Sequence, residues 1–406
     1  MYFFQSARVY LAPQFMTHML GVCASFYLGF NLVLGGGVAE IPVVFVSLVA
    51  LMFFRPSDAA LYEGFKLRIF WATLLLGFSL FNCFMVWFHA GEIELYEPYA
   101  KLLVGSLVAF AFAYHRINLV YIRAGLYLAA VSLIYLYFYE YSGHGRYSAG
   151  MNPNKWSPML LSYAVVALVF VLFDKSRLFK VIAFVAWSVF AGMILIAGSR
   201  STSLLLGLVS ICFLLFMTLR SPSSIRVLTL IAFILTSFVL YGSAGSLFKS
   251  KMVYLSNEIS AASQLDHFTS SNGLRFIMWK SGLSSVKGNV YIGSGYDLAK
   301  SISDYEPDSK GEEKAIKVLK KYYGSFHNIW VDTVVTQGVI GLVVLLSFFI
   351  ISLILVYKNR ALLMLGPLIA VGLNGLTEST LYMSILAGHL ALAGAIFMNI
   401  DEKLQT

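Results

Sequence analysis

Apolar runs long enough to cross a lipid bilayer recur along almost the whole chain, and they limit its possible folds more than any other feature. A hydrocarbon core about 30 Å thick requires roughly 20 mostly apolar residues per helix. Apolar residues make up 59% of the sequence and charged residues only 12%, whereas soluble domains are typically about 25% charged. In lipid, an apolar helix satisfies all its own backbone polar groups. The sequence therefore predicts an all-α polytopic membrane protein.

About twelve segments qualify as transmembrane helices. Those at the fourth, sixth and eleventh positions are short for a bilayer, which indicates local burial or thinning. The expected helices are 12–32, 38–54, 67–89, 101–115, 118–140, 158–173, 179–197, 202–219, 226–243, 329–356, 361–376 and 380–399. Nine helices thus fall within 1–242, one large polar loop covers 243–328, and three helices fall within 329–406.

Basic residues gather in alternate short connections between these helices. By the positive-inside rule such connections are cytoplasmic. Both termini are then cytoplasmic and the 243–328 loop lies on the outer side. The net charge of +9 follows from this distribution and does not indicate a nucleic-acid partner. The residues are Arg55, Lys66, Arg68, Arg116, Arg123, Lys175, Arg177, Lys180, Arg220, Arg226, Lys358 and Arg360.

Three short outer connections carry polar groups that a simple turn does not need. The 141–157 connection contains Arg146 and an Asn-Pro-Asn sequence ending at Asn154, which is typical of a turn. A tight Ser-Arg-Ser turn carries Arg200, and the last outer connection carries Glu378. Both arginines depart from the positive-inside trend, and such exceptions usually have a binding partner.

Within the large loop, residues 273–287 are expected to form a helix capped by Ser271 or Asn272. Arg275 and Trp279 are four residues apart and share one face. An arginine in a first turn opposes the helix dipole. This placement is understandable if an anion binds there, held by the free N–H groups and the guanidinium together.

A second loop helix is expected at about 310–323. It starts with a capping box, Ser309 to Glu312. Lysines surround one apolar face, which suits a helix lying on an anionic membrane surface. That apolar face comprises Ile316, Leu319 and Tyr323.

His327 lies where the loop re-enters the membrane. Ser325 or Asn328 is placed to cap the helix that follows. A neutral imidazole at this position can accept a proton, as a general base must. Asp332, slightly more than one turn further, is expected to orient the histidine or pair with an arginine.

From His327 the chain reads HNIWVDTVVTQGVIG, with nine residues between the His-Asn pair and Gly338-Val339-Ile340-Gly341. This spacing resembles the signature of bacterial O-antigen ligases and, more broadly, of the O-antigen ligase and polymerase superfamily. The Asn-Pro-Asn turn, the Ser-Arg-Ser turn around Arg200, and the Arg275 and Trp279 pair are similar as well. So is the large loop between the ninth and tenth spans.

The resemblance implies a glycosyltransferase of the membrane-embedded C class in the bacterial inner membrane, with a periplasmic site. Such ligases move a glycan from undecaprenyl pyrophosphate to the lipid A-core, with inversion and without a metal or cofactor. Carried over here, Arg200 and Arg275 bind the donor pyrophosphate and His327 deprotonates the acceptor hydroxyl. The expected supporting residues are Arg146, Asn154, Asn328, Asp332 and Glu378.

Other readings remain open. An O-antigen polymerase would use the same donor twice, and a third kind of relative attaches glycans to protein serines. A lipid-linked glycan flippase or a transporter would bind its substrate near the midplane, between broken helices. The ionisable residues gather at one face instead, which favours an enzyme at the membrane surface. Glu92 and Glu94 superficially resemble an acidic metal-binding pair, but no matching carboxylates accompany them.

Overall fold

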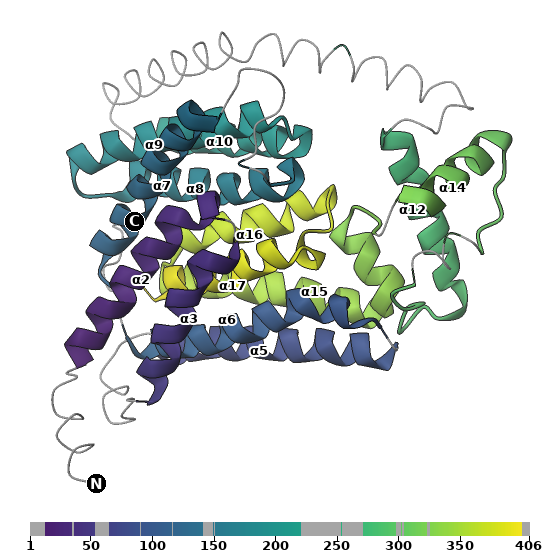
Figure 1. Ribbon diagram of the computed structural model, residues 1–406, viewed down its shortest axis with the longest axis horizontal. Helices are drawn as coiled ribbons and strands as arrows, with labels where there is room; N and C mark the ends of the chain where they lie inside the picture. Colours follow the sequence, from purple (N-terminus) through teal and green to yellow (C-terminus); the bar gives the residue numbers. More distant parts are fainter. Residues whose placement is uncertain are drawn as a thin grey trace.

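The computed structural model consists of helices and connecting turns over the residues that it describes (Figure 1). These residues are 13–34, 36–52, 65–89, 91–115, 117–140, 149, 151–220, 253, 271–297, 302, 304–322 and 325–399. The first group of helices is α2 (Pro13–Leu34), α3 (Gly36–Met52), α5 (Phe65–Phe88), η1 (Ile93–Tyr96), α6 (Glu97–Tyr114), α7 (Leu119–Glu140), α8 (Pro153–Phe173), α9 (Arg177–Ala197) and α10 (Arg200–Arg220). The large loop contributes α12 (Ser271–Ser285), η2 (Val286–Gly288) and α14 (Lys310–Tyr322). The last group is α15 (Ile329–Asn359), η3 (Leu362–Met364), α16 (Leu365–Gly372), η4 (Asn374–Leu376), η5 (Thr380–Tyr382) and α17 (Ser384–Met398).

Eight of the described helical segments are long and apolar enough to cross a membrane. Three more apolar helical segments are shorter: Val38–Leu51, Leu362–Leu376 and Ser384–Met398. The all-α polytopic prediction is confirmed at this level. The expected helix at 226–243 lies outside the described residues, so the count of twelve stays a prediction.

Two helices expected to be short are in fact full-length. The fourth segment continues through η1 and α6 from Ile93 to Tyr114, and the sixth, α8, begins at Pro153. Asn152 is the N-cap of α8, and its side chain accepts a hydrogen bond from the Asn154 N–H at 2.9 Å. The Asn-Pro-Asn sequence therefore starts a helix rather than forming a loop turn, because proline fits the first helical position.

Helix α8 lies at the centre of the transmembrane bundle. Every residue from Trp156 to Val171 is buried, and the helix packs against α9 and α16. Around it, α6 packs between α5 and α17, while α2 packs against α3 and α7. Helix α10 instead exposes large apolar side chains along one face, as expected for a surface in contact with lipid. They include Leu204, Leu208, Ile211 and Leu215.

Helices α12 and α14 lie past the end of α5, at the right of Figure 1. They share a small core of their own with the start of α15, to which Met278 of α12 and Phe326 contribute. Ile316 and Leu319 of α14 are buried in this core. At these two positions the apolar face of α14 covers protein, whereas Tyr323 lies outside the described residues, and the expectation that the lysine-rich helix lies on a membrane surface stays a prediction.

Helix α15 is kinked at Gly338, whose backbone has φ 68° and ψ −162°. The kink frees backbone groups that the connection after η2 then satisfies. The Val339 N–H donates to the Val290 carbonyl at 2.9 Å, and the Ser294 N–H donates to the Val335 carbonyl at 2.7 Å. The large loop is thus joined by backbone hydrogen bonds to the helix that follows His327.

Candidate functional site

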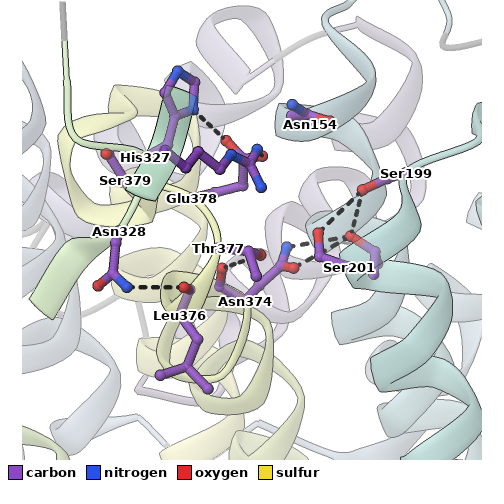
Figure 2. A network of polar contacts seen from close by, with 12 residues as sticks. Asn154, Ser199, Ser201, His327, Asn328, Asn374, Leu376, Thr377, Glu378 and Ser379 are labelled. Atoms are coloured by element: carbon purple, nitrogen blue, oxygen red, sulfur yellow. Dashed lines mark hydrogen bonds and ion pairs between the residues drawn. The ribbon is translucent and has the colours of Figure 1, made fainter. Parts of the chain in front are cut away.

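Three segments distant in the sequence bring charged side chains together around one carboxylate. The Oε1 atom of Glu378 accepts from Nη2 of Arg275 at 2.8 Å, and its Oε2 atom lies 3.0 Å from Nδ1 of His327. Figure 2 shows His327 and Glu378 pointing toward each other. Arg275 comes from α12, His327 precedes α15, and Glu378 lies between η4 and η5. Helix packing thus assembles two of the predicted site residues around a third.

Burial strengthens these contacts. The Glu378 side chain is only 3% exposed, whereas Arg275 is 22% and His327 24% exposed. A buried carboxylate is stabilised by paired charge and hydrogen bonds, and Arg275 supplies both. When Nδ1 of His327 donates to this carboxylate, Nε2 on the other side of the ring is left as a proton acceptor. The arrangement can orient a base beside an anion-binding cation.

The backbone of His327 adopts φ 50°, which is uncommon for a residue other than glycine. The peptide groups on both sides of the preceding residue are held in place. The Phe326 carbonyl accepts from the Trp279 indole at 2.8 Å, and the Phe326 N–H donates to Oδ1 of Asp332 at 2.9 Å. The other oxygen of Asp332 accepts from the Ser379 hydroxyl.

Asn328 caps α15, as expected. Its side-chain oxygen accepts from the Trp330 and Val331 amides at 2.9 and 3.1 Å. Its side-chain nitrogen donates to the Leu376 carbonyl at 2.9 Å (Figure 2). One side chain therefore both starts α15 and ties it to the segment that leads into Glu378.

Arg200 is half-buried at the first residue of α10. This end of α10 contacts the Glu378 segment, because the Thr202 hydroxyl and the Asn374 side chain are 3.3 to 3.4 Å apart. The Glu378 N–H in turn donates to the Asn374 carbonyl at 3.1 Å. Contacts between the Thr202 and Asn374 side chains, together with this backbone hydrogen bond, thus connect the start of α10 to the backbone of Glu378.

Two expectations about individual residues need correction. Helix α12 begins at Ser271, so Arg275 opens its second turn rather than lying in the first. Asp332 bonds to the Phe326 amide and to Ser379, and Glu378 takes the place expected for it beside the histidine.

Of the two remaining supporting residues, Arg146 and Asn154, the structure describes only Asn154. Arg146 lies outside the described residues. Asn154 lies in the first turn of α8, not in a loop, and its side chain makes no bond among the residues drawn in Figure 2. Asn374 and Ser379 are parts of the site that the sequence interpretation missed. The polar run NGLTEST at 374–380, inside an otherwise apolar region, was the available signal.

Across the described part of the chain, no three His, Cys, Asp or Glu side chains gather as metal ligands would. Glu92 and Glu94 lie at the short helix η1 and are exposed.

Residues 183–346 match the family model described as O-antigen ligase. The match runs from within α9 to within α15 and includes Arg200, Arg275 and His327, whereas Glu378 lies beyond it. No curated protein matches the chain. The family match confirms the resemblance to the O-antigen ligase superfamily that the motifs predicted.

Proposed function

We propose that this protein is a membrane-embedded glycosyltransferase, because residues 183–346 match the O-antigen ligase family model. It transfers a glycan from undecaprenyl pyrophosphate to a hydroxyl group of the lipid A-core on the periplasmic side of the bacterial inner membrane. The observation that carries the proposal is the contact of one buried carboxylate, Glu378, with both His327 and Arg275. This pairing supports a role for His327 as a base beside a cation, Arg275, that suits a pyrophosphate.

The reaction begins at His327. Its Nε2 atom takes the proton of the acceptor hydroxyl while the oxygen attacks the anomeric carbon of the donor glycan. The new carbon–oxygen bond forms as the bond to the pyrophosphate breaks, and the leaving group keeps the electron pair. Attack opposite the leaving group inverts the configuration. Glu378 stabilises the imidazolium that forms, since its carboxylate faces the other ring nitrogen at 3.0 Å.

The arginines neutralise the leaving group. A guanidinium has five N–H donors in a planar fork that suits phosphate oxygens. The ion pair with Glu378 uses Nη2 of Arg275, so other donors of the same group remain for the pyrophosphate. Arg200 adds a second guanidinium from the neighbouring α10, whose start contacts the same segment through Thr202. Donors fixed before the reaction stabilise developing charge without a reorganisation cost.

Reconstitution in liposomes tests this function directly. The purified protein is mixed with an undecaprenyl-pyrophosphate glycan and lipid A-core, and the products are separated on a gel. We expect one glycan block to become attached to the core. A longer lipid-linked glycan with no core attachment would show a polymerase instead, and glycan movement across the membrane without a new bond would show a flippase.

Single variants test the residues. His327→Ala, Arg200→Ala and Arg275→Ala should each abolish transfer while membrane insertion persists. Arg177→Ala is the matched control, because this exposed arginine starts α9 at the opposite end from Arg200. Normal turnover in all three site variants would refute the assignment.

A further inference from the structure

The peptide groups around Phe326 are held from two sides immediately before the proposed base. We propose that Trp279 and Asp332 are positioning residues that fix this backbone and thereby aim His327 at the acceptor hydroxyl. The inference rests on the proposed function of His327. It concerns two side chains that lie close to the base without carrying out the chemistry.

His327 requires such support because of its own backbone. A φ of 50° is uncommon for a residue that carries a Cβ, and such conformations persist only where the surrounding structure holds them. The Phe326 carbonyl belongs to the peptide bond that leads into His327, and the Trp279 indole donates to it at 2.8 Å. Loss of that bond would free the peptide plane to rotate and the imidazole to turn with it.

Asp332 connects the segment that carries His327 to the segment that carries Glu378. Its side chain is buried, and one of its oxygens accepts from the Phe326 N–H at 2.9 Å. The other oxygen accepts from the hydroxyl of Ser379, the residue that follows Glu378. One carboxylate therefore fixes the backbone of the base relative to the backbone of its partner.

Trp279 connects α12 to the backbone that precedes His327. It lies one turn after Arg275, on the face that the two residues share. Gly282 packs against the Phe326 ring, where an added Cβ would lie 2.4 Å from Cε1. Helix α12 is thus fixed to Phe326 at two points, and it positions the donor-binding arginine and the base together.

Two substitutions at Asp332 separate positioning from a role for its charge. In Asp332→Asn the amide oxygen can still accept from Phe326, and the amide N–H can donate to Ser379, whose hydroxyl also accepts. Asp332→Ala loses both bonds. We expect kcat within about fivefold of wild type for the asparagine variant and a loss of about 100-fold for the alanine variant. Equal inactivity of the two variants would show that the charge is required and would overturn positioning by Asp332.

Trp279→Phe keeps an aromatic ring and removes the N–H donor. We expect kcat per folded molecule to fall about tenfold, as one lost hydrogen bond allows, with the donor KM unchanged. Trp156→Phe is the matched control, because its indole donates to the Leu32 carbonyl at 2.9 Å within the bundle core. An unchanged kcat, or a raised donor KM alone, would overturn the inference for Trp279.

Folding and chemistry are then distinguished by further measurements. Thermal unfolding of each purified variant gives the folded fraction by which kcat is divided. If Asp332→Ala does not fold, Ser379→Ala removes one of the two bonds to Asp332 and should lower kcat in its place; unchanged turnover would count against the inference.

His327→Ala distinguishes failure of the proposed function from failure of the positioning inference. If it remains active, the proposed function fails, whereas an inactive His327→Ala beside a fully active Trp279→Phe refutes the positioning alone.

Discussion

At the scale of the residue, Glu378 binds two different groups with its two oxygens. Oε1 holds the Arg275 guanidinium and Oε2 faces the His327 imidazole. The side chain is 3% exposed, so the loss of either partner would leave a buried oxygen unsatisfied at a cost in free energy. Without the Glu378 carboxylate, the His327 ring would no longer be oriented from its Nδ1 side, and Arg275 would lose its counter-charge.

Glu378→Ala should therefore lower kcat by about 100-fold, the effect expected when a catalytic group shifts by about 1 Å. The donor KM should change less than in Arg275→Ala, because the arginine itself is still present. Steady-state transfer assays on both variants provide the comparison. Glu97→Ala serves as a control, since Glu97 lies in the first turn of α6 and belongs to none of the described site contacts. Equal kcat for Glu378→Ala and wild type would remove Glu378 from the mechanism.

The sequence led to His327, Asn328, Arg200 and Arg275 because each belongs to a local motif. It could not lead to the pairing at Glu378, because the carboxylate is 51 residues from His327 and 103 from Arg275. Contacts of this kind depend on how helices pack. A single sequence shows only which residues could face one another along the same helix.

At the scale of the element, the kink in α15 depends on glycines that face one another. A Cβ added to Gly338 would lie 2.4 Å from the Tyr291 backbone, and one added to Gly293 would lie 2.5 Å from the Gln337 backbone nitrogen. Both residues have positive φ. Neither backbone can move away without loss of the hydrogen bonds that join the loop to α15.

Gly338→Ala should lower the unfolding free energy by about 2–4 kcal/mol, from backbone strain and overpacking together. Thermal unfolding in detergent measures this as a lower melting temperature. Gly207→Ala in α10 is the control, because nothing lies within 4 Å of an added Cβ there. It should be neutral or slightly stabilising, since alanine favours the helix. Equal melting temperatures for the two variants would contradict the role of the kink.

Helices α12 and α14 are joined by a cluster whose strength depends on pH. Lys280 bonds to Asp308 at 2.6 Å and to Glu312 at 2.7 Å. Burial alone would raise the pKa of Glu312, but hydrogen bonds from Lys280, the Asp308 N–H and the Tyr305 hydroxyl lower it below its usual 4.5. Hydrogen bonds to Asp308 and Glu312 raise the pKa of Lys280 above its usual 10.5.

A lowered carboxyl pKa stabilises docking above pH 4.5, and this contribution is lost as the pH falls through the folded value. A raised lysine pKa stabilises docking below pH 10.5 and is lost as the pH rises through its folded value. The protection factors of the α14 amides, which are hydrogen-exchange rates divided into the intrinsic rate at each pH, should therefore be highest between these limits. Glu312→Gln should remove the acidic limb, while Glu313→Gln, at an exposed pair with Lys317, should keep it. An unchanged acidic limb in Glu312→Gln would argue against this cluster.

Most helices could be predicted because bilayer thickness sets their length. The sequence alone does not decide where a short pattern fits two structures. Asn152-Pro153 fits a turn and a helix start equally well, and the buried face of α14 has the same pattern whether it covers lipid or protein. Only the neighbouring element decides between such readings.

At the scale of the whole molecule, α15 connects the site to the opposite side of the bundle. Its residues 339–359, which follow the kink at Gly338, rise about 31 Å at 1.5 Å per residue, about the thickness of a hydrocarbon core. His327 lies just before its start, and the exposed Lys358 lies near its end. Lys314 is exposed on α14, which shares a core with α12 and the start of α15. One orientation in the membrane therefore places Lys314 and Lys358 in different compartments.

The positive-inside rule predicts that Lys314 is periplasmic and Lys358 cytoplasmic. In a background without Cys23, Cys83 and Cys212, Lys314→Cys should react with a membrane-impermeant maleimide in intact spheroplasts. Lys358→Cys should react only after lysis, because the bilayer separates it from the reagent. Mass-tag shifts on a gel give the extent of reaction for each variant. Labelling of Lys358→Cys before lysis, with Lys314→Cys protected, would reverse the orientation and put the Glu378 site in the cytoplasm, where a periplasmic acceptor could not reach it.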